Sequence, residues 1–520
     1  MVQSIFKIVT ISIAFSSLVN AQFEGTQLNT TEALPSYTLY QNFNLTYVVD
    51  NCGGIVAEWP NIENSRFHPK LLPNGNIIHI TGNQIVEHDW EGNRLRSTSV
   101  EADLELIYEV ILLPNGNYLS AARRVVSGDF FTDLGYSEAA ELFTWNDAVV
   151  EINPEDGSIV WEWRISDHII QQRDQNLPNY GILEENPQLL NVDAISAFDW
   201  TTRESFMING MDYNPELDQI ALSVRKMSEV IIIDHSTTAE EARGHTGGKS
   251  GMGGDILYRW GNPQNYNQGG PEDRILFFQH NPNWIEHGEH KGSLVMYNNG
   301  LNRPNTNFQT QFSTVEIVNT GVNVDGRYTK LEDEPFGPSI PTFTLSGEVD
   351  KNDFYSGYTC GAEVLPNGNI FITIGRNLRE FTMDGQQVWV YQIPFGGPFR
   401  TEKYPLDYPA FQNRDLTPDG TVEERPSIFD CELSETVSID NLNATSLQGI
   451  TVTQSDGIVT LAHEREKFSY AIFNSNAQLI KKNGTAENHH IIHTGLYQTG
   501  LYIIQIKSDS GTESLKIFIK

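Results

Sequence analysis

The chain has 520 residues, more than one hydrophobic core usually organises, so two or three domains are expected. It carries 67 acidic and 34 basic residues, a formal net charge of −33, which argues against the basic face that a nucleic-acid partner requires. Glycine and proline gather in turns between short apolar runs, a distribution typical of an all-β protein.

Residues 1–21 have the pattern of an export signal peptide. Lys7 precedes an apolar run over residues 8–19, and a cleavage position follows Ala21. The run is too short to span a bilayer, and no later stretch is long and apolar enough to form a membrane helix. We therefore expect an exported protein with no membrane span.

A repeated turn motif follows an N-terminal extension over residues 22–44. The string Leu-Pro-Asn-Gly-Asn occurs at Leu72–Asn76, Leu113–Asn117 and Leu365–Asn369, each time between two strand-like runs. Asn-Gly in this setting predicts a tight hairpin in which both residues adopt positive φ. A second kind of hairpin, with glycine before a tryptophan-bearing strand, alternates with the first.

Two alternating hairpins per unit make a four-stranded antiparallel meander, which is the blade of a β-propeller. The first two copies of the motif lie 41 residues apart, a usual blade length. We therefore predict a β-propeller over residues 45–391 with six blades, or seven.

The pattern changes after residue 391. Residues 392–426 contain six prolines and predict an extended segment that wraps the propeller or links it to the next domain. Alternating strands then resume over residues 427–520, and their length predicts a small C-terminal β-sandwich.

The three cysteines, Cys52, Cys360 and Cys431, allow at most one disulfide within a monomer. Export permits such a bridge, and a pairing of Cys52 with Cys431 would tie the start of the propeller to its end. The sequence leaves the pairing open. Since no Cys-x-x-Cys pair exists, we expect no cysteine-based metal site and assign no metal ligand.

Several strings in the repeat region occur together and in order. They are Val49–Gly53, His68–Asn76, Trp161–Trp163 with Asp167 and His168, Ile233–Thr238, Tyr258–Pro263, Gln279–His280 and Asp407–Pro409. Together they resemble the arylsulfotransferase family, the aryl-sulfate sulfotransferases that work without the nucleotide donor PAPS. The resemblance implies transfer of a sulfuryl group from a phenolic sulfate ester to a phenolic or other hydroxyl acceptor, with no cofactor.

The C-terminus carries a second resemblance. The strand-like run Gly500–Ile504, a turn and the run Ser514–Lys520 are similar to the sorting domain of the type IX secretion system. This implies that the secretion machinery is a partner and that the protein is secreted or displayed at the cell surface after passing through the periplasm.

The resemblance also points to site residues. Enzymes of the family use a histidine nucleophile near the propeller channel, with other histidines, an asparagine and an arginine around the sulfate. Here His280 matches an active-site histidine, Arg303 stands in a plausible place for the sulfate-binding arginine, His168 lies in a matching string, and Asn209 survives in a string that otherwise departs from the family. An anionic group in transfer needs such cationic support.

The sequence also departs from the family. Met207 stands where a histidine is common, and no histidine lies between His290 and His463. A nucleophile expected in that later stretch therefore has no candidate, and Met207 cannot substitute as a base, because a thioether takes no proton at neutral pH. A second hypothesis is therefore a propeller that has lost the chemistry and binds sulfated aromatics or glycans.

Overall fold

The described residues of the computed structural model are 24–43, 45–60, 62, 67–126, 132–135, 145–197, 206–307, 309–347, 354–394, 396–423, 431, 450–455, 458–463, 467–474, 479–493, 500–508 and 511–519. The chain consists of two compact units, Met1–Leu433 and Ser434–Lys520. The predicted signal peptide at residues 1–21 lies outside the described residues. Within them, no helix has the length and apolar character needed to cross a membrane.

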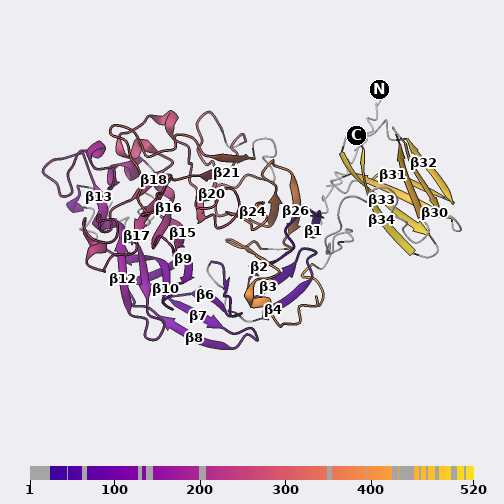
Figure 1. Cartoon of the computed structure of the whole chain (residues 1–520), viewed down its shortest axis with the longest axis horizontal. Helices are drawn as coiled ribbons and strands as arrows, with labels where there is room; N and C mark the ends of the chain where they lie inside the picture. The colour runs from indigo at the N-terminus through magenta and orange to yellow at the C-terminus, as the bar shows by residue number, and fades with distance from the viewer. Residues whose placement is uncertain are drawn as a thin grey trace, which may run out of the picture. The chain divides into compact units, whose positions relative to one another are not determined.

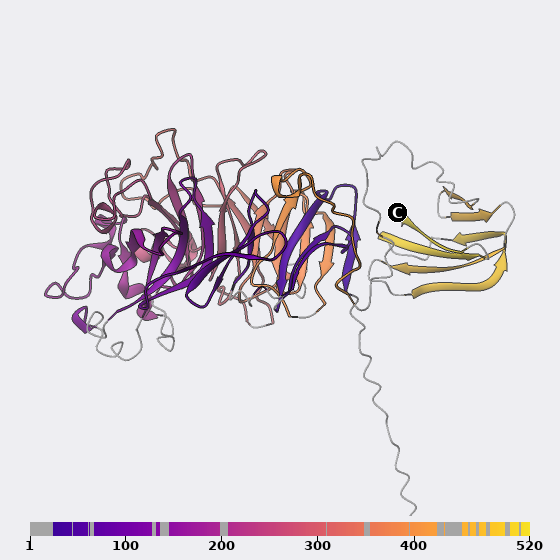
Figure 2. The same cartoon turned by 90° about the horizontal axis from the view of Figure 1, so that it is seen from below.

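The first unit is built from antiparallel sheets (Figures 1 and 2). Its described residues form six sheets of four or five strands, ordered β27-β2-β3-β4, β5-β6-β7-β8, β12-β11-β10-β9, β15-β16-β17-β18, β19-β20-β21-β22 and β1-β26-β25-β24-β23. A short parallel pair, β13 with β14, accompanies them. The all-β class is therefore confirmed, while the number of propeller blades stays a prediction.

The strands of this unit are β1 Gly25–Asn29, β2 Ser36–Asn42, β3 Leu45–Asp50, β4 Ile55–Pro60, β5 Lys70–Leu71, β6 Ile77–Thr81, β7 Gln84–His88, β8 Arg94–Ser99, β9 Leu104–Leu112, β10 Tyr118–Val125, β11 Trp145–Ile152, β12 Ile159–Arg164, β13 Ile169–Ile170, β14 Leu190–Asn191, β15 Ile208–Asn214, β16 Gln219–Val224, β17 Glu229–Asp234, β18 Tyr258–Trp260, β19 His280–Trp284, β20 Leu294–Asn298, β21 Thr314–Val318, β22 Phe343–Ser346, β23 Gly361–Val364, β24 Ile370–Ile374, β25 Asn377–Phe381, β26 Gln387–Gln392 and β27 Glu402–Pro405. Its 3-10 helices are η2 Ile165–His168, η3 Leu183–Glu185, η4 Val192–Ala197, η5 Arg225–Met227, η6 Glu241–Arg243, η7 Pro263–Tyr266, η8 Pro271–Asp273 and η9 Pro409–Phe411.

The repeated motif forms the expected hairpins with a different turn. In the first copy Gly75 N–H donates to Leu72 O at 2.9 Å, and Leu72 N–H donates to Asn76 O at 2.7 Å. Gly75 has φ +90°, whereas Asn74 is not left-handed. The prediction that both residues adopt positive φ is wrong, because Pro73 fixes its own φ near −65° and selects a type I turn closed by a left-handed glycine.

Both segments that flank the repeats supply strands. β1, from the predicted N-terminal extension, pairs with β26, so that Asn29 lies opposite Trp389. β2, from the same extension, pairs with β27 of the proline-rich segment, so that Leu39 lies opposite Glu402. The two ends of the first unit are therefore part of its sheets.

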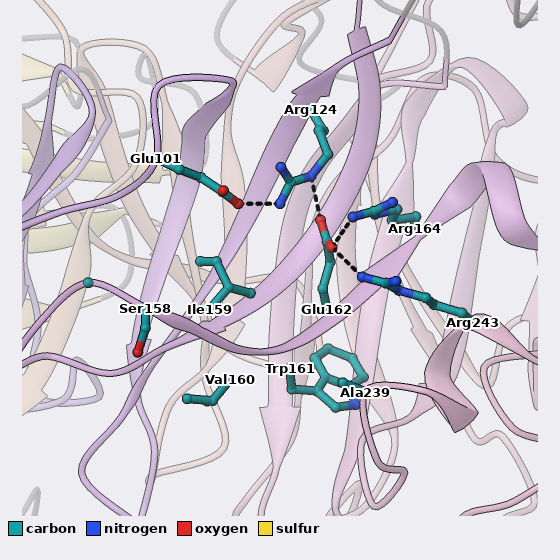
Figure 3. Close-up of a pocket in the computed structure, with 11 residues that line it drawn as sticks. Glu101, Arg124, Ser158, Ile159, Val160, Trp161, Glu162, Arg164, Ala239 and Arg243 are labelled. Carbon is teal, nitrogen blue, oxygen red and sulfur yellow. Dashed lines mark hydrogen bonds and ion pairs between the residues drawn. The ribbon is translucent and has the colours of Figure 1, made fainter.

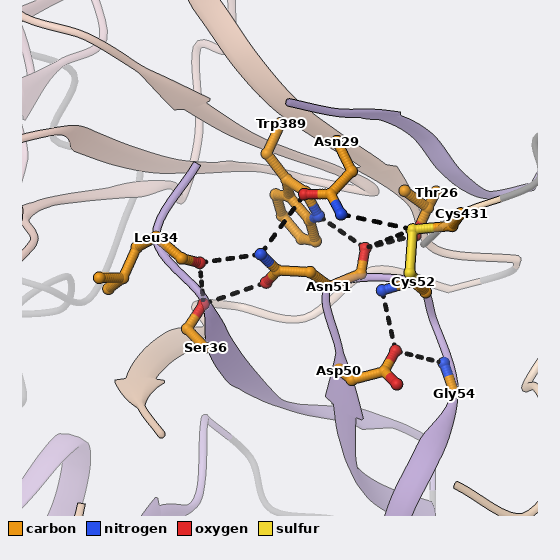
Figure 4. Close-up of a disulfide and its surroundings, with 10 residues drawn as sticks. All are labelled: Thr26, Asn29, Leu34, Ser36, Asp50, Asn51, Cys52, Gly54, Trp389 and Cys431. Carbon is orange, nitrogen blue, oxygen red and sulfur yellow. Dashed lines mark hydrogen bonds between the residues drawn. A yellow bond between two sulfur atoms is a disulfide. The ribbon is translucent and has the colours of Figure 1, made fainter. Parts of the chain in front are cut away.

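A disulfide joins the two ends as well (Figure 4). Cys52 is bonded to Cys431, 379 positions away, with their Cα atoms 5.3 Å apart. The neighbouring Asn51 carbonyl accepts hydrogen bonds from Trp389 Nε1 at 2.8 Å and from Thr26 Oγ1 at 2.9 Å. Of the pairings left open by the sequence, the structure selects Cys52 with Cys431.

The apolar cores lie between neighbouring sheets. One buried cluster, for example, combines Ile107 of β9 and Leu119 of β10 with Ile208 of β15 and Ile220 of β16. Packing of one sheet face on the next removes both sets of side chains from water.

The second unit contains two antiparallel sheets, ordered β28-β29-β32 and β31-β30-β33-β34. Its strands are β28 Ile450–Ser455, β29 Ile458–His463, β30 Phe468–Asn474, β31 Leu479–Glu487, β32 His489–His493, β33 Gly500–Ser508 and β34 Gly511–Ile519. Leu461 of one sheet and Ile472 and Ile504 of the other share one buried cluster. This region is therefore β-rich with a core of its own.

Candidate functional site

Edge strands of the first unit lie beside strands of neighbouring sheets. β9 contacts β6 and β15, and β19 contacts β15 and β23. Polar groups bridge these edges: Arg400, just before β27, donates to Glu109 Oε2 of β9 at 2.5 Å and to the Asn209 carbonyl of β15 at 3.3 Å. Lys403 N–H of β27 donates to Glu363 Oε1 of β23 at 3.0 Å.

Glu109 and Glu402 share their cations. Lys70 Nζ lies 3.6 Å from Glu109 and 3.4 Å from Glu402, and His68 Nε2 lies 3.5 Å and 3.3 Å from the same two carboxylates. Burial alone would raise the pKa of Glu402, but Lys70 and His68 outweigh it and hold that pKa well below its usual range. His68, Glu109 and Glu402 have metal-ligand spacing, but Lys70 and Arg400 already supply the positive charge there.

Two neighbouring carboxyls titrate closer to neutral pH. Burial raises the pKa of Asp212 on β15 to about 6, against an opposing hydrogen bond from Trp284 N–H. Burial and the charge of Glu402 raise the pKa of Glu363 on β23 to about 8. Groups with such pKa values can exchange protons under working conditions.

Among the buried polar atoms at these edges that lack a hydrogen-bond partner within the described residues are Asn209 Oδ1, Asn281 Oδ1 and Arg400 Nε. A cavity of about 20 Å³, room for one water molecule, lies against Asn281 and Arg400. Packing around it is tight, because a Cβ on Gly361 would lie 2.8 Å from Arg400 Cγ. Buried polar atoms left unpaired in this way are consistent with a bound water, ion or ligand.

His280, the first residue of β19, is held in one tautomer. Asn299 Nδ2 donates to the carbonyls of Ser356 at 2.8 Å and Thr359 at 3.0 Å, so Asn299 Oδ1 faces the histidine as an acceptor. His280 Nδ1 lies 2.7 Å from that oxygen and must carry the proton. In the neutral ring Nε2 then keeps its lone pair.

The surroundings also keep His280 uncharged. Burial, followed by the charge of Arg225 and to a lesser degree that of Arg400, lowers the pKa of His280 to about 3. Arg225 begins η5 and its guanidinium lies over the Phe278 ring at 4.8 Å. A neutral imidazole under the influence of two guanidinium charges is suited to meet an anion without first being protonated.

Aromatic rings cover the same region. Phe399 lies 6.4 Å from the His280 ring and 5.3 Å from the Tyr108 ring, and Phe67 lies 4.8 Å from Tyr108. These three rings come from distant parts of the chain and give the region an apolar wall.

Of the predicted residues, the structure brings Asn209 to His280. Asn209 Nδ2 donates to the carbonyl of Gln279 at 2.9 Å, next to the histidine. Arg303 follows β20, and its guanidinium packs 5.0 Å from the Phe277 ring and 4.5 Å from the Phe312 ring. Met207, in a left-handed conformation, has its sulfur 3.8 Å from Arg225 NH1.

The structure does not bring His168 to His280. His168 ends η2 and stacks on Trp163 of β12 at 5.5 Å. β12 is the edge of its sheet opposite to β9. The two ring nitrogens of His168 face the Asp255 carboxylate and the Ala242 carbonyl instead.

Sequence reasoning missed Arg225, Arg400 and Asn299. Arg225 follows a buried strand and Arg400 lies within the proline-rich segment, so neither belongs to a motif that announces a site. The one available signal was the pair Asn298 and Asn299, two polar residues at the end of an apolar strand and both fully buried.

A larger cavity, about 470 Å³, lies elsewhere (Figure 3). Glu162 of β12 accepts hydrogen bonds there from Arg124 Nε at 2.7 Å, Arg164 NH2 at 2.5 Å and Arg243 NH2 at 3.3 Å. None of the four predicted site residues lines this cavity.

Comparison with known proteins gives two family matches. The model described as Arylsulfotransferase (ASST) matches residues 26–393, and the model described as Secretion system C-terminal sorting domain matches residues 455–520. The sorting domain indicates a secreted or cell-surface protein that is handled by the type IX machinery. No curated protein matches the chain.

Among solved structures, a protein of unknown function from Bacteroides caccae is 12% identical, with a TM-score of 0.38, over 71% of this chain and 98% of that one. A putative 6-phosphogluconolactonase from Bacteroides fragilis is 9% identical, with a TM-score of 0.35, over 72% and 99%. Such TM-scores are too low to carry an argument about this chain.

Proposed function

The chain belongs to the arylsulfotransferase (ASST) family, and from this premise we propose that it transfers a sulfuryl group from a phenolic sulfate ester to a hydroxyl acceptor at His280. The supporting observation is the fixed neutral tautomer of His280 beside Arg225 and Arg400. In this proposal the six sheets are the blades of a propeller, and their edge strands line its centre.

The reaction has two steps. His280 Nε2 attacks the sulfur of the aryl sulfate, the S–O bond to the ring breaks, and the phenolate leaves with the bonding pair. The acceptor oxygen then attacks the same sulfur, and the S–N bond breaks to restore the imidazole. Arg225 and Arg400 stabilise the sulfuryl oxygens, and the wall of Phe67, Tyr108 and Phe399 takes the aromatic ring.

The acceptor must lose a proton in the second step. Among the buried carboxyls of these strands, Asp212 has the pKa suited to this role, because a value of about 6 leaves its carboxylate ionised at neutral pH yet basic enough to accept a proton. Glu363, with a pKa of about 8, is protonated under the same conditions and does not serve.

The test is release of 4-nitrophenol from 4-nitrophenyl sulfate with phenol as acceptor, followed by absorbance. Wild-type protein should turn over, and His280→Ala should lose about a thousand-fold or more in kcat. Arg225→Gln should lower kcat, because it removes charge stabilisation of the sulfuryl group in transfer. The control is His287→Ala, at an exposed histidine outside the site, which should match wild type.

Absence of turnover with several aryl sulfates and acceptors would contradict the proposal. If calorimetry then shows saturable binding of 4-nitrophenyl sulfate that Arg400→Gln weakens, the chain is a binding protein for sulfated ligands. Met207, at a position where histidine is common in the family, is the residue that favours this second function.

A further inference from the structure

Three side chains from separate segments meet outside the proposed site. They are His168 at the end of η2, His245 just after η6, and Asp255 just before β18. His168 Nδ1 lies 2.9 Å from Asp255 Oδ1, and His245 Nδ1 lies 2.7 Å from the same oxygen. The three ligand atoms lie within 4.8 Å of one another.

The hydrogen positions in this group conflict. His168 Nε2 lies 2.9 Å from the Ala242 carbonyl oxygen, which can only accept, so Nε2 carries a proton. In a neutral ring Nδ1 then directs its lone pair at Asp255 Oδ1, which also presents lone pairs. A positive centre between the two atoms would turn this repulsion into attraction.

The His168 side chain has no room to relieve the conflict. It is fully buried and lies parallel to the Trp163 ring. The backbone before Asp255 presses against it, because a Cβ on Gly254 would lie 2.6 Å from His168 Nε2 and 2.1 Å from the Ala242 oxygen. Gly254 N–H also donates to Gly244 O at 3.0 Å, which holds His245 beside Asp255.

We propose that His168 Nδ1, His245 Nδ1 and Asp255 Oδ1 bind one divalent transition-metal ion, with Zn²⁺ as the best fit. Two imidazole nitrogens and a carboxylate oxygen are ligands that Zn²⁺ accepts, and water completes the coordination from the side where His245 is 57% exposed. The hydrogen bond from His168 Nε2 to a backbone carbonyl is the support that metal-bound histidines usually receive.

A proton on His168 is the competing explanation, and the geometry favours the metal. Both imidazoles point at a single carboxylate oxygen, Asp255 Oδ1. Two independent N–H donors would be expected to divide between the two oxygens, whereas ligands of one ion converge. The ion fastens the glycine-rich segment 244–255 to η2 and so to the sheet β9–β12.

The experiment uses the full chain, stripped with a chelator and dialysed. We expect about one zinc per chain by mass spectrometry after reloading with ZnCl₂, and a rise in melting temperature of roughly 5 °C at saturating metal. His245→Ala and Asp255→Asn should abolish both effects, and His287→Ala should preserve them. His245 is half exposed, so its loss leaves the fold intact.

Zinc content below 0.1 per chain after reloading, with no change in melting temperature on adding Zn²⁺, Mn²⁺ or Ni²⁺, would overturn the proposal in favour of a protonated His168. Equal zinc uptake by Asp255→Asn would overturn it as well. Sulfuryl transfer at His280 needs no metal, so failure here leaves the proposed function standing.

Discussion

The neutrality of His280 predicts a loss of stability at acid pH. Its pKa is about 3 in the fold against 6.5 for an exposed histidine. Below pH 6.5 the unfolded chain therefore binds a proton that the folded chain refuses until about pH 3, and stability falls as pH drops through this window. At about 1.4 kcal/mol per pH unit, lowering the pH from 7 to 4.5 costs about 2.5 kcal/mol through this residue alone.

The measurement is urea unfolding at pH 7 and pH 4.5 for wild type and His280→Gln. Glutamine does not titrate, so the variant should lose about 2.5 kcal/mol less than wild type between the two conditions. His287→Gln, at a half-exposed position, should behave as wild type. If both variants lose as much stability as wild type, His280 accepts a proton in the fold and the reasoning fails.

Three further predictions follow from the described contacts. Cys52→Ser should lower the free energy of unfolding. The loss reaches about 6 kcal/mol if the disulfide acts by closing the 379-residue loop in the unfolded chain. Thermal unfolding with and without reductant measures it. A chain ending at residue 430 should lose as much, whereas one ending at Leu433 should keep its melting temperature; equal melting temperatures for the two truncations would contradict the role given to Cys431. Asn299→Asp should raise the pKa of His280 by about one to three units, because the new carboxylate attracts the protonated ring directly. NMR titration of the histidine would detect this shift. An unchanged titration would contradict the tautomer assigned to His280.

The sheets could be predicted because their signals are local. Each Leu-Pro-Asn-Gly-Asn string carries its own turn chemistry, and the alternation on either side fixes the flanking strands. β1, β2 and β27 could not be recognised in the same way, because each pairs with a strand from the far end of the unit. Such pairing leaves no trace in a short window of sequence.

The site was predictable only where a motif marked it. His280 came from a string that resembles the family, and Asn209 survives in a string that departs from it. The structure brings them together, because Asn209 Nδ2 donates to the Gln279 carbonyl next to His280. Arg400 reaches Glu109 only because the proline-rich segment returns to the sheets. His168 illustrates the opposite case: its string matched, but its surroundings depend on Asp255, a residue 87 positions away.

The pairing of β2 with β27 has a consequence for the order in which the protein can fold. During synthesis β2 and β3 form early, but one edge of β2 stays open until residues 402–405 arrive, when nearly the whole unit has been made. Closure therefore depends on highly non-local contacts, which makes folding slow and late. A chain that completes its fold late can still pass through an export channel in an unfolded state. Until then, the open edge of β2 must be kept from pairing with strands of other chains.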